Sequence, residues 1–304
     1  RPKKEREPID FLSKKKVFFT ISLVLIAAGL ITIGVNAGRG NGAFAYSLEF
    51  QGGTSTNVTF DKDYSIDEID KEIVPVVEKV TGDNNVQTQK VAGTNQVIIK
   101  TVTLDLDKRE ALNKAMVDNF GVDESKITAE NISSTVSNEM RRDAVIAVVI
   151  ATICMLLYIW FRFKDIRFAT SAVLALLHDV LVVVGFYAIA RISVGNTFIA
   201  CMLTIVGYSI NATIVIFDRI REEMRGKTKS SDVAAVVNKS ITQTLTRSIY
   251  TSLTTFIMVA VLYVMGVSSI KEFALPLMVG VVCGAYSSVC ITGALWYVMK
   301  RFKK

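Results

Sequence analysis

Long apolar runs separated by short charged stretches dominate the pattern of hydrophobic and polar positions along this chain. A helix that crosses a bilayer needs about 20 mostly apolar residues. Six runs approach that length and predict a multi-pass α-helical membrane protein. The predicted spans are residues 17–35, 144–161, 168–190, 197–217, 247–267 and 273–299. The first run is not followed by an obvious small-residue cleavage site, which favours a retained anchor over a cleaved signal peptide.

Between the first two spans, about 105 residues follow a different pattern of short elements. Residues 65–80 have apolar positions at helical spacing and begin with Ser65 and Glu68, the signature of a helix-capping box. A second helix is predicted over residues 107–121. The predicted strands are residues 47–60, with a bend at Gly52 and Gly53, residues 85–104 in two halves joined at 92–95, and residues 127–137.

The resulting order, strand-helix-strand-strand-helix-strand, is that of a ferredoxin-like α+β unit. This domain, residues 37–142, contains no histidine and no cysteine, and its acidic residues are spread along helix faces. We therefore expect it to be a scaffold that contacts a polypeptide or another subunit, not an enzyme active site.

The net charge of +7 comes from Lys and Arg clusters at alternate ends of the predicted spans. An excess of these residues marks the cytoplasmic side of a membrane protein. With both termini cytoplasmic, the clusters fall on the inner side, and residues 37–142 are extracytoplasmic. The charge therefore indicates membrane lipid, and not nucleic acid, as the surroundings of this protein.

The same placement divides the rest of the chain. Residues 1–16 form a cytoplasmic basic arm, residues 17–36 the first membrane helix, and residues 143–304 the other five membrane helices. Within this last part, residues 230–246 have apolar positions at helical spacing after a capping Ser-Ser pair. They predict an amphipathic helix at the cytoplasmic interface that runs into the fifth span.

Small side chains within the spans are expected to serve helix packing. In the sixth span, Gly280, Gly284 and Ser288 recur every four residues, which lets membrane helices approach closely. The 4 cysteines all lie in predicted spans, without the spacing of a metal site or a disulfide framework. We expect them to be packing residues, and we expect no metal ion.

Ionisable groups in the hydrocarbon region are candidates for function, because their burial in lipid is costly. His178 and Asp179 lie about halfway along the third span, roughly 16 Å from its inner end at about 1.5 Å per residue. They predict either a titratable pair that relays protons or a hydrogen-bonding partner that fixes helix packing.

A polar stripe in the fifth span is a second candidate. Arg247 opens this span and shares a helix face with Gln243 and Thr251. Such a stripe must face other helices or water, which favours a functional path. The alternative is an arginine that snorkels to the lipid headgroups.

In the fourth span, Asn211, Ala212 and Thr213 interrupt an apolar run about 9 Å above its inner boundary. If the two spans are neighbours, this is close to the depth of Arg247. A carboxylate at position 212 would be protonated when it faces a dry path and ionised beside the guanidinium. Ala212 can do neither.

Four motifs in this order resemble the SecF family, the smaller membrane subunits of bacterial SecDF protein-export complexes. They are LEFQGGT (48–54), LLHDV (176–180), FIACMLTIVGYSINATIVIFDRIREE (198–223) and NKSITQTLTRSIYTSLTT (238–255). The resemblance covers nearly the whole chain. It implies a six-helix bundle of the RND (resistance–nodulation–division) type in the bacterial cell membrane. It also implies SecD as a heteromeric partner, the SecYEG channel and unfolded exported polypeptides as further partners, the proton motive force as energy source, and no hydrolytic activity or organic cofactor.

One position departs from the family pattern. The family reads Gly-Tyr-Ser-Ile-Asn-Asp-Thr where residues 207–213 read GYSINAT, so Ala212 stands in place of the carboxylate of the family's proton relay. The resemblance matches Arg247 to the arginine of that relay, and Asn211 and Thr213 to its neighbours. Three explanations stay open: a deliberate replacement that traps or disables a conformation, a natural variant in which an acid of SecD carries the protons, or coupling to another ion.

The leading hypothesis is a SecF-type subunit that couples proton passage between the fourth and fifth spans to movement of outer domains that hold a translocating polypeptide. One alternative is a non-conducting scaffold that stabilises SecYEG or recruits the insertase YidC. Another is an ion-coupled RND-type transporter of a different substrate. A membrane enzyme is disfavoured, because intramembrane proteolysis needs two facing aspartates or a His-Glu metal pair and only Asp179 lies deep.

Overall fold

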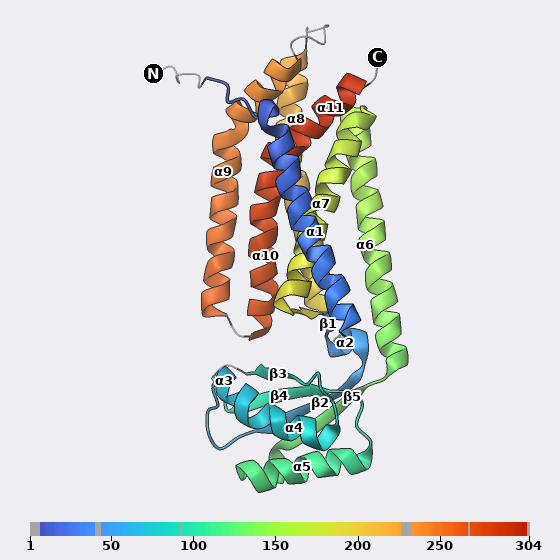
Figure 1. Cartoon of the computed structure of the whole chain (residues 1–304), viewed down its shortest axis with the longest axis vertical. Helices are drawn as coiled ribbons and strands as arrows, with labels where there is room; N and C mark the ends of the chain where they lie inside the picture. Colours follow the sequence, from blue (N-terminus) through green and yellow to red (C-terminus); the bar gives the residue numbers. More distant parts are fainter. Residues whose placement is uncertain (1–6, 40–43, 92, 226–232, 267, 303–304) are drawn as a thin grey trace.

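The computed structural model describes residues 7–39, 44–91, 93–225, 233–266 and 268–302. It consists of a bundle of long helices with a small α+β domain at one end (Figure 1). The first six residues of the basic arm, the predicted turn residue 92 and the capping pair at 230–231 lie outside the described residues.

The bundle contains the predicted membrane helices. Their bounds are α1 Lys15–Gly38, α6 Ser134–Phe163, α7 Ile166–Ala190, α8 Asn196–Met224, α9 Val233–Met265, α10 Ser268–Ser287 and α11 Gly293–Phe302. A π turn, Ser288–Thr292, joins α10 to α11, and a 3-10 turn, Leu12–Lys14, precedes α1. In the described part of the chain, six helical segments are long and apolar enough to cross a membrane. The chain is therefore a helical membrane protein.

Two helices extend beyond the spans expected from hydrophobicity. Helix α6 begins at Ser134 because the side chain of Ser133 accepts a hydrogen bond from the N–H of Val136 and caps it. The last strand, predicted over residues 127–137, is correspondingly shorter and ends at Ile132. Helix α9 runs without a break from Val233, so the amphipathic segment and the fifth span form one helix.

The α+β domain contains the predicted order of elements. They are β2 Gly53–Thr59, α3 Ile66–Glu68, the π turn Ile69–Ile73, α4 Val74–Thr81, β3 Gln87–Lys90, β4 Gln96–Thr101, α5 Leu106–Phe120, the 3-10 turn Glu124–Lys126 and β5 Ile127–Ile132. The strands form an antiparallel sheet in the order β3-β4-β2-β5. The predicted capping box at Ser65 and Glu68 is confirmed.

One face of this sheet is covered by helices α4 and α5, which lie on the side away from the bundle (Figure 1). Val58 and Ile99 of the sheet pack there against Ile73, Leu112 and Met116. The other face turns towards the membrane helices. The domain therefore has its own hydrophobic core and presents a polar sheet face and one edge, β3, to the end of the bundle.

The strand predicted over residues 47–60 begins later than expected. Leu48–Gln51 forms a short helix, α2, and the strand starts at Gly53. Gly52 and Gly53 both have positive φ, at 77° and 141°, which favours glycine. A Cβ on Gly53 would lie 2.2 Å from the carbonyl oxygen of Thr101, so the chain can reverse here only with glycine. The bend predicted at Gly52 and Gly53 is therefore present, but alternating polarity did not reveal the short helix before it.

A second short sheet ties the domain linker to the bundle. Strand β1, Ala45–Tyr46, pairs in parallel with β6, Ser193–Val194, between α7 and α8. The hydroxyl of Ser137 on α6 donates to the carbonyl of Leu48 at 3.3 Å, and the guanidinium of Arg141 donates to the carbonyl of Phe50. The linker is thus held by one membrane helix, α6, and by the strand β6 between two others.

The six membrane segments differ sharply in burial. Half of the most apolar window of α7 is buried inside the chain (50%), compared with only 11% for the α1 segment, 6% for α6 and 11% for α9. Helices α7, α8 and α10 form the centre, and α6 and α9 lie on opposite outer sides (Figure 1). Faces of the outer helices are therefore free to contact lipid or another protein.

Candidate functional site

Helices α7, α8 and α10 meet around one buried carboxylate. Asp179 of α7 is completely buried. Its Oδ2 accepts hydrogen bonds from the hydroxyls of Ser209 on α8, at 2.6 Å, and Ser287 on α10, at 2.9 Å. Its Oδ1 lies 2.9 Å from Nδ1 of His178 and 3.4 Å from Sγ of Cys283. We call these five residues the Asp179 cluster.

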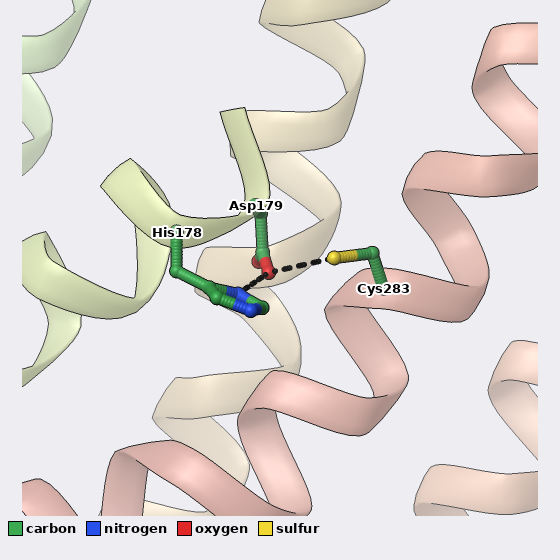
Figure 2. Close-up of side chains that lie close together, drawn as sticks. All are labelled: His178, Asp179 and Cys283. Atoms are coloured by element: carbon green, nitrogen blue, oxygen red, sulfur yellow. Dashed lines mark hydrogen bonds and ion pairs between the residues drawn. The ribbon is translucent and has the colours of Figure 1, made fainter. Parts of the chain in front are cut away.

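Figure 2 shows that His178, Asp179 and Cys283 point towards one another from α7 and α10. The spacing explains the arrangement, because Cys283 and Ser287 are four residues apart and share one face of α10. Both oxygens of Asp179 have partners, as a buried carboxylate requires. The Nε2 atom of His178 is buried without a hydrogen-bond partner among the residues the structure describes.

The same cluster contains donor atoms of the kinds that bind metals. One ligand atom each from His178, Asp179 and Cys283 lies within 4.8 Å of the others. Nitrogen, oxygen and sulfur together suit zinc. However, the two serine hydroxyls already donate to the carboxylate and satisfy it within the chain. The geometry is thus that of a closed hydrogen-bonded junction between three helices.

A second polar site lies between α8 and α9. It is a small pocket of about 70 Å³. The pocket is lined by Tyr208, Asn211, Ala212, Val215, Arg247, Ser248, Thr251 and Ser252. Its walls are joined by a hydrogen bond of 2.5 Å from the hydroxyl of Tyr208 to Oγ of Ser252. We call it the Arg247 pocket.

The two sequence segments predicted to lie at one depth, Asn211-Ala212 and Arg247, share this pocket. Asn211, Arg247 and Thr251 are exposed. In the described part of the chain, Arg247 has neither an ion pair nor a hydrogen bond. The pocket therefore presents a guanidinium at an outer surface of the bundle without a compensating group from this chain.

Not every predicted residue lies in the Arg247 pocket. Thr213 is buried and does not line it. Gln243 accepts a hydrogen bond of 2.6 Å from Nε of Arg219 instead. Helical periodicity explains why Thr213 lies outside the pocket. Thr213 is four residues from Ser209, so both residues lie on the face of α8 that contacts Asp179.

Periodicity also places the two sites on different faces of α8. Tyr208, Asn211, Ala212 and Val215 follow the three- and four-residue steps of one face. Ser209 is rotated by about 200° from Asn211 at 3.6 residues per turn. Helix α8 therefore separates the Asp179 cluster from the Arg247 pocket.

The small residues of the sixth span lie against α8 or within the π turn. A Cβ on Gly280 would lie 2.3 Å from Cδ1 of Ile205, and one on Gly284 would lie 3.4 Å from the ring of Tyr208. Ser288 is buried and donates to the carbonyl of Ala285 at 3.1 Å. Gly280 thus lets Ile205 of α8 pack directly on the backbone of α10.

The sequence reasoning missed several members of both sites. Ser209, Cys283 and Ser287 were not predicted to bind Asp179, and Tyr208 and Val215 were not assigned to the second site. Serines and cysteines are common packing residues in membrane helices, so their type carries little signal. The four-residue step from Cys283 to Ser287 was the available clue.

Comparison with known proteins gives one consistent result. Residues 112–302 match the family described as "Protein export membrane protein SecD/SecF, C-terminal". The "Protein translocase subunit SecF" of Petrotoga mobilis is 35% identical over 97% of this chain and 98% of the relative. The "Protein translocase subunit SecDF" of Bacillus subtilis is 36% identical over 96% of this chain and 38% of the relative.

Solved structures agree. The crystal structure of SecDF from Thermus thermophilus, described as a translocon-associated membrane protein, is similar with a TM-score of 0.78 and 31% identity. The match covers 97% of this chain and 39% of that one. A structure of SecDF in the "Super-membrane-facing form" gives a TM-score of 0.69. The chain thus spans about two fifths of the SecDF proteins that it matches.

Proposed function

The chain belongs to the SecD/SecF family of protein export membrane proteins, and from this premise we propose that it works with SecD to drive polypeptide export by the proton motive force. It is a SecF-type accessory subunit of the protein translocase in the bacterial membrane. The proposal adds three elements to that identity: SecD as the partner that completes the membrane bundle, SecYEG as the channel that is assisted, and proton movement through the Arg247 pocket.

The observation that carries the proposal is the incomplete Arg247 pocket. A guanidinium stays charged at every physiological pH. An unpaired charge at membrane depth is costly unless it faces water or an oppositely charged group. The exposed polar face of α9 is therefore the side on which we expect SecD. This expectation agrees with the SecDF relatives, in which the counterpart of this chain is part of a longer polypeptide.

Proton carriage needs a group that gains and loses a proton near neutral pH. Arg247 cannot do so, and Ala212 has no titratable atom. We infer that an acidic side chain of SecD enters the pocket and is held ionised by Arg247 in one conformation. In the other conformation it leaves the guanidinium and takes up a proton from the opposite side. The roles of Arg247 and of Asn211 are then electrostatic stabilisation and hydrogen bonding, with no cofactor and no covalent chemistry.

The α+β domain is the element that such a cycle would move. Its antiparallel strand order supports a ferredoxin-like unit, and we propose an extracytoplasmic position for it, with both termini in the cytoplasm. The basic residues at the end of the bundle remote from this domain support that orientation. Movement of α8 against α9 would reach the domain through the linker that α6 and β6 hold.

The proposal is tested by export into proteoliposomes that contain SecYEG, SecD and this chain, with and without an imposed proton gradient. We expect the gradient to increase export when the wild-type chain is present. Arg247→Gln should abolish this increase in proteoliposomes that are supplied with enough SecD to keep the weakened complex assembled. Stimulation that is equal with and without the gradient would refute proton coupling.

A non-conducting scaffold is the second candidate, and Ala212 favours it because the chain alone lacks a carboxylate in the pocket. In this case the chain would stabilise SecYEG or hold YidC without ion movement. Ala212→Asp separates the two functions, with Ala212→Asn as the uncharged control. A gain of gradient-dependent export specific to Ala212→Asp supports the relay, whereas equal export by all three forms supports the scaffold.

A further inference from the structure

A large cleft lies where the α+β domain faces the end of the bundle. Its volume is about 810 Å³, within the range of sites that hold substantial ligands. One wall is formed by β3 and the loop before it, including Gln87, Thr88 and Gln89. The opposite wall contains Tyr263 of α9 and Leu275 of α10. Neither the Asp179 cluster nor the Arg247 pocket contributes to it.

Strand β3 is the last strand on one side of the sheet and pairs only with β4. The N–H of Val91 donates to the carbonyl of Gln96 at 3.0 Å, which continues the β3-β4 ladder by one residue pair. Hydrogen-bonded pairs alternate along an antiparallel ladder. The backbone groups of Gln87 and Gln89 therefore face β4, and those of Thr88 face away from it.

The backbone N–H and C=O of Thr88 have no hydrogen-bond partner in the described part of the chain. An edge strand with such free groups is a template for a further strand. The lining of the cleft is polar: Gln87, Gln89, Asn84 and Asn85 are uncharged, and the other lining residues include charged side chains of both signs, Asp70, Lys100, Arg191, Lys271 and Glu272. Backbone pairing supplies affinity that does not depend on the sequence of the added strand.

We propose that the cleft binds an extended segment of an unfolded exported polypeptide, which adds to β3 as a fifth strand of the sheet. This inference rests on the proposed function in protein export. A strand that pairs with four residues covers about 14 Å at roughly 3.4 Å per residue. The added strand would donate to, and accept from, the backbone of Thr88, with its side chains against both walls of the cleft.

The position of the cleft links this binding to the membrane helices. The Nε2 amide of Gln87 donates to the carbonyl of Tyr46 at 3.2 Å, so β3 is tied to the linker strand β1. The far wall belongs to α9 and α10, and α9 carries Arg247. A polypeptide in the cleft therefore contacts both the sheet and the helix of the Arg247 pocket.

The test uses the complete chain with SecD and SecYEG in membranes and a polypeptide stalled during export. A photoreactive benzophenone side chain replaces Gln89, and crosslinks to the polypeptide are measured. Thr88→Pro removes the outward N–H without breaking the pairing with β4, since an edge proline is tolerated when its nitrogen faces outward. We expect crosslinking to fall about fivefold, the loss typical of one hydrogen bond.

Thr88→Val is the matched control, because it removes the hydroxyl but keeps the N–H, and it should crosslink like the wild type. If Thr88→Pro does not fold, Leu275→Trp narrows the cleft from the opposite wall and should lower crosslinking without altering β3. Full crosslinking in both variants would refute the proposal, and so would crosslinks to SecD alone. If the chain still co-purifies with SecD and still stimulates export but forms no crosslinks, the strand addition is refuted and the proposed function stands.

Discussion

Asp179 and Arg247 are both ionisable side chains on membrane-crossing helices, yet the chain treats them in opposite ways. Asp179 is fully buried, and hydroxyls from two other helices donate to it. Arg247 is exposed at the edge of a pocket of about 70 Å³, and no group of the described chain neutralises it. One site is complete within the chain and the other is open.

The difference separates a site that holds the fold together from a site that this chain leaves open. A buried carboxylate with hydrogen bonds to all sides fixes the helices around it, because each donor loses its partner if the helices separate. An open charged pocket contributes little to packing, so its position must be explained by a ligand, water or a second subunit. Helix α8 carries residues of both sites on different faces.

The largest expected effect concerns the closed site. Asp179→Ala leaves two serine hydroxyls, a thiol and an imidazole without their acceptor in a buried space. Each unsatisfied buried polar group costs about 1–3 kcal/mol. We expect a loss of at least about 3 kcal/mol, seen as a strong decrease in the thermal unfolding midpoint in detergent and in the yield of folded protein.

Asp83→Ala is the matched control for this variant, because its carboxylate also accepts hydrogen bonds but lies only half-buried in the α+β domain. Its loss should affect stability much less. Equal losses for Asp179→Ala and Asp83→Ala would mean that the cluster is no more important for the fold than a surface turn.

A smaller effect is expected when a single donor of the cluster is removed. Ser287→Ala removes one hydrogen bond of 2.9 Å to an acidic acceptor and retains the bond from Ser209. Removing one partner of a buried hydrogen bond costs about 1–3 kcal/mol. We expect a loss of about 2 kcal/mol in unfolding experiments on the detergent-solubilised chain.

The double variant of Ser287→Ala and Ser209→Ala sharpens this result. The two hydroxyls share one oxygen of Asp179, so their losses should not add. Strict additivity of the two unfolding free energies would show that the serines act independently and that the cluster is not a unit.

The hydrogen bond between Tyr208 and Ser252, which joins α8 to α9 at the Arg247 pocket, should contribute less to stability than the bond from Ser287. Tyr208→Phe removes the hydrogen bond of 2.5 Å from Tyr208 to Ser252 but keeps the ring that packs near Gly284. One neutral hydrogen bond contributes about 1 kcal/mol. The thermal midpoint should fall slightly, and Ser252→Ala should reproduce the decrease. If Tyr208→Phe lowered stability as much as Ser287→Ala does, the α8-α9 contact would stabilise the fold as strongly as a donor of the Asp179 cluster.

The sequence predicted the open site better than the closed one. Arg247 and the Asn211-Ala212 notch stand out because amides and guanidinium groups are rare in apolar runs, and their depths could be compared by counting residues. Asp179 was also conspicuous. Its partners were not, since Ser209 and Ser287 become donors only through the crossing of α7, α8 and α10, which periodicity within a single helix does not determine.

The fold shows the same division between local and long-range information. The capping box at Ser65 and the spans follow from patterns a few residues long and were predicted. The bend at Gly52 and Gly53 was predicted too, but the short helix Leu48–Gln51 before it was predicted as a strand, because alternating polarity carries no signal for a single helical turn. The pairing of β1 with β6 joins segments about 150 residues apart and left no local pattern.

The smallest expected effect is that of Arg247→Met on the chain alone. The side chain is exposed and has no partner in the described part of the chain, so its loss should change the unfolding free energy by less than about 0.5 kcal/mol. The same variant should weaken the complex with SecD, because there the guanidinium would face an acidic partner, and truncating one side of a buried pair leaves the other charge unpaired. Both quantities are measurable on one preparation, by thermal unfolding of the isolated chain and by co-purification at increasing detergent concentration. A stability loss in the isolated chain equal to that of Ser287→Ala would show that the open site is closed within this chain, and the contrast between the two regions would disappear.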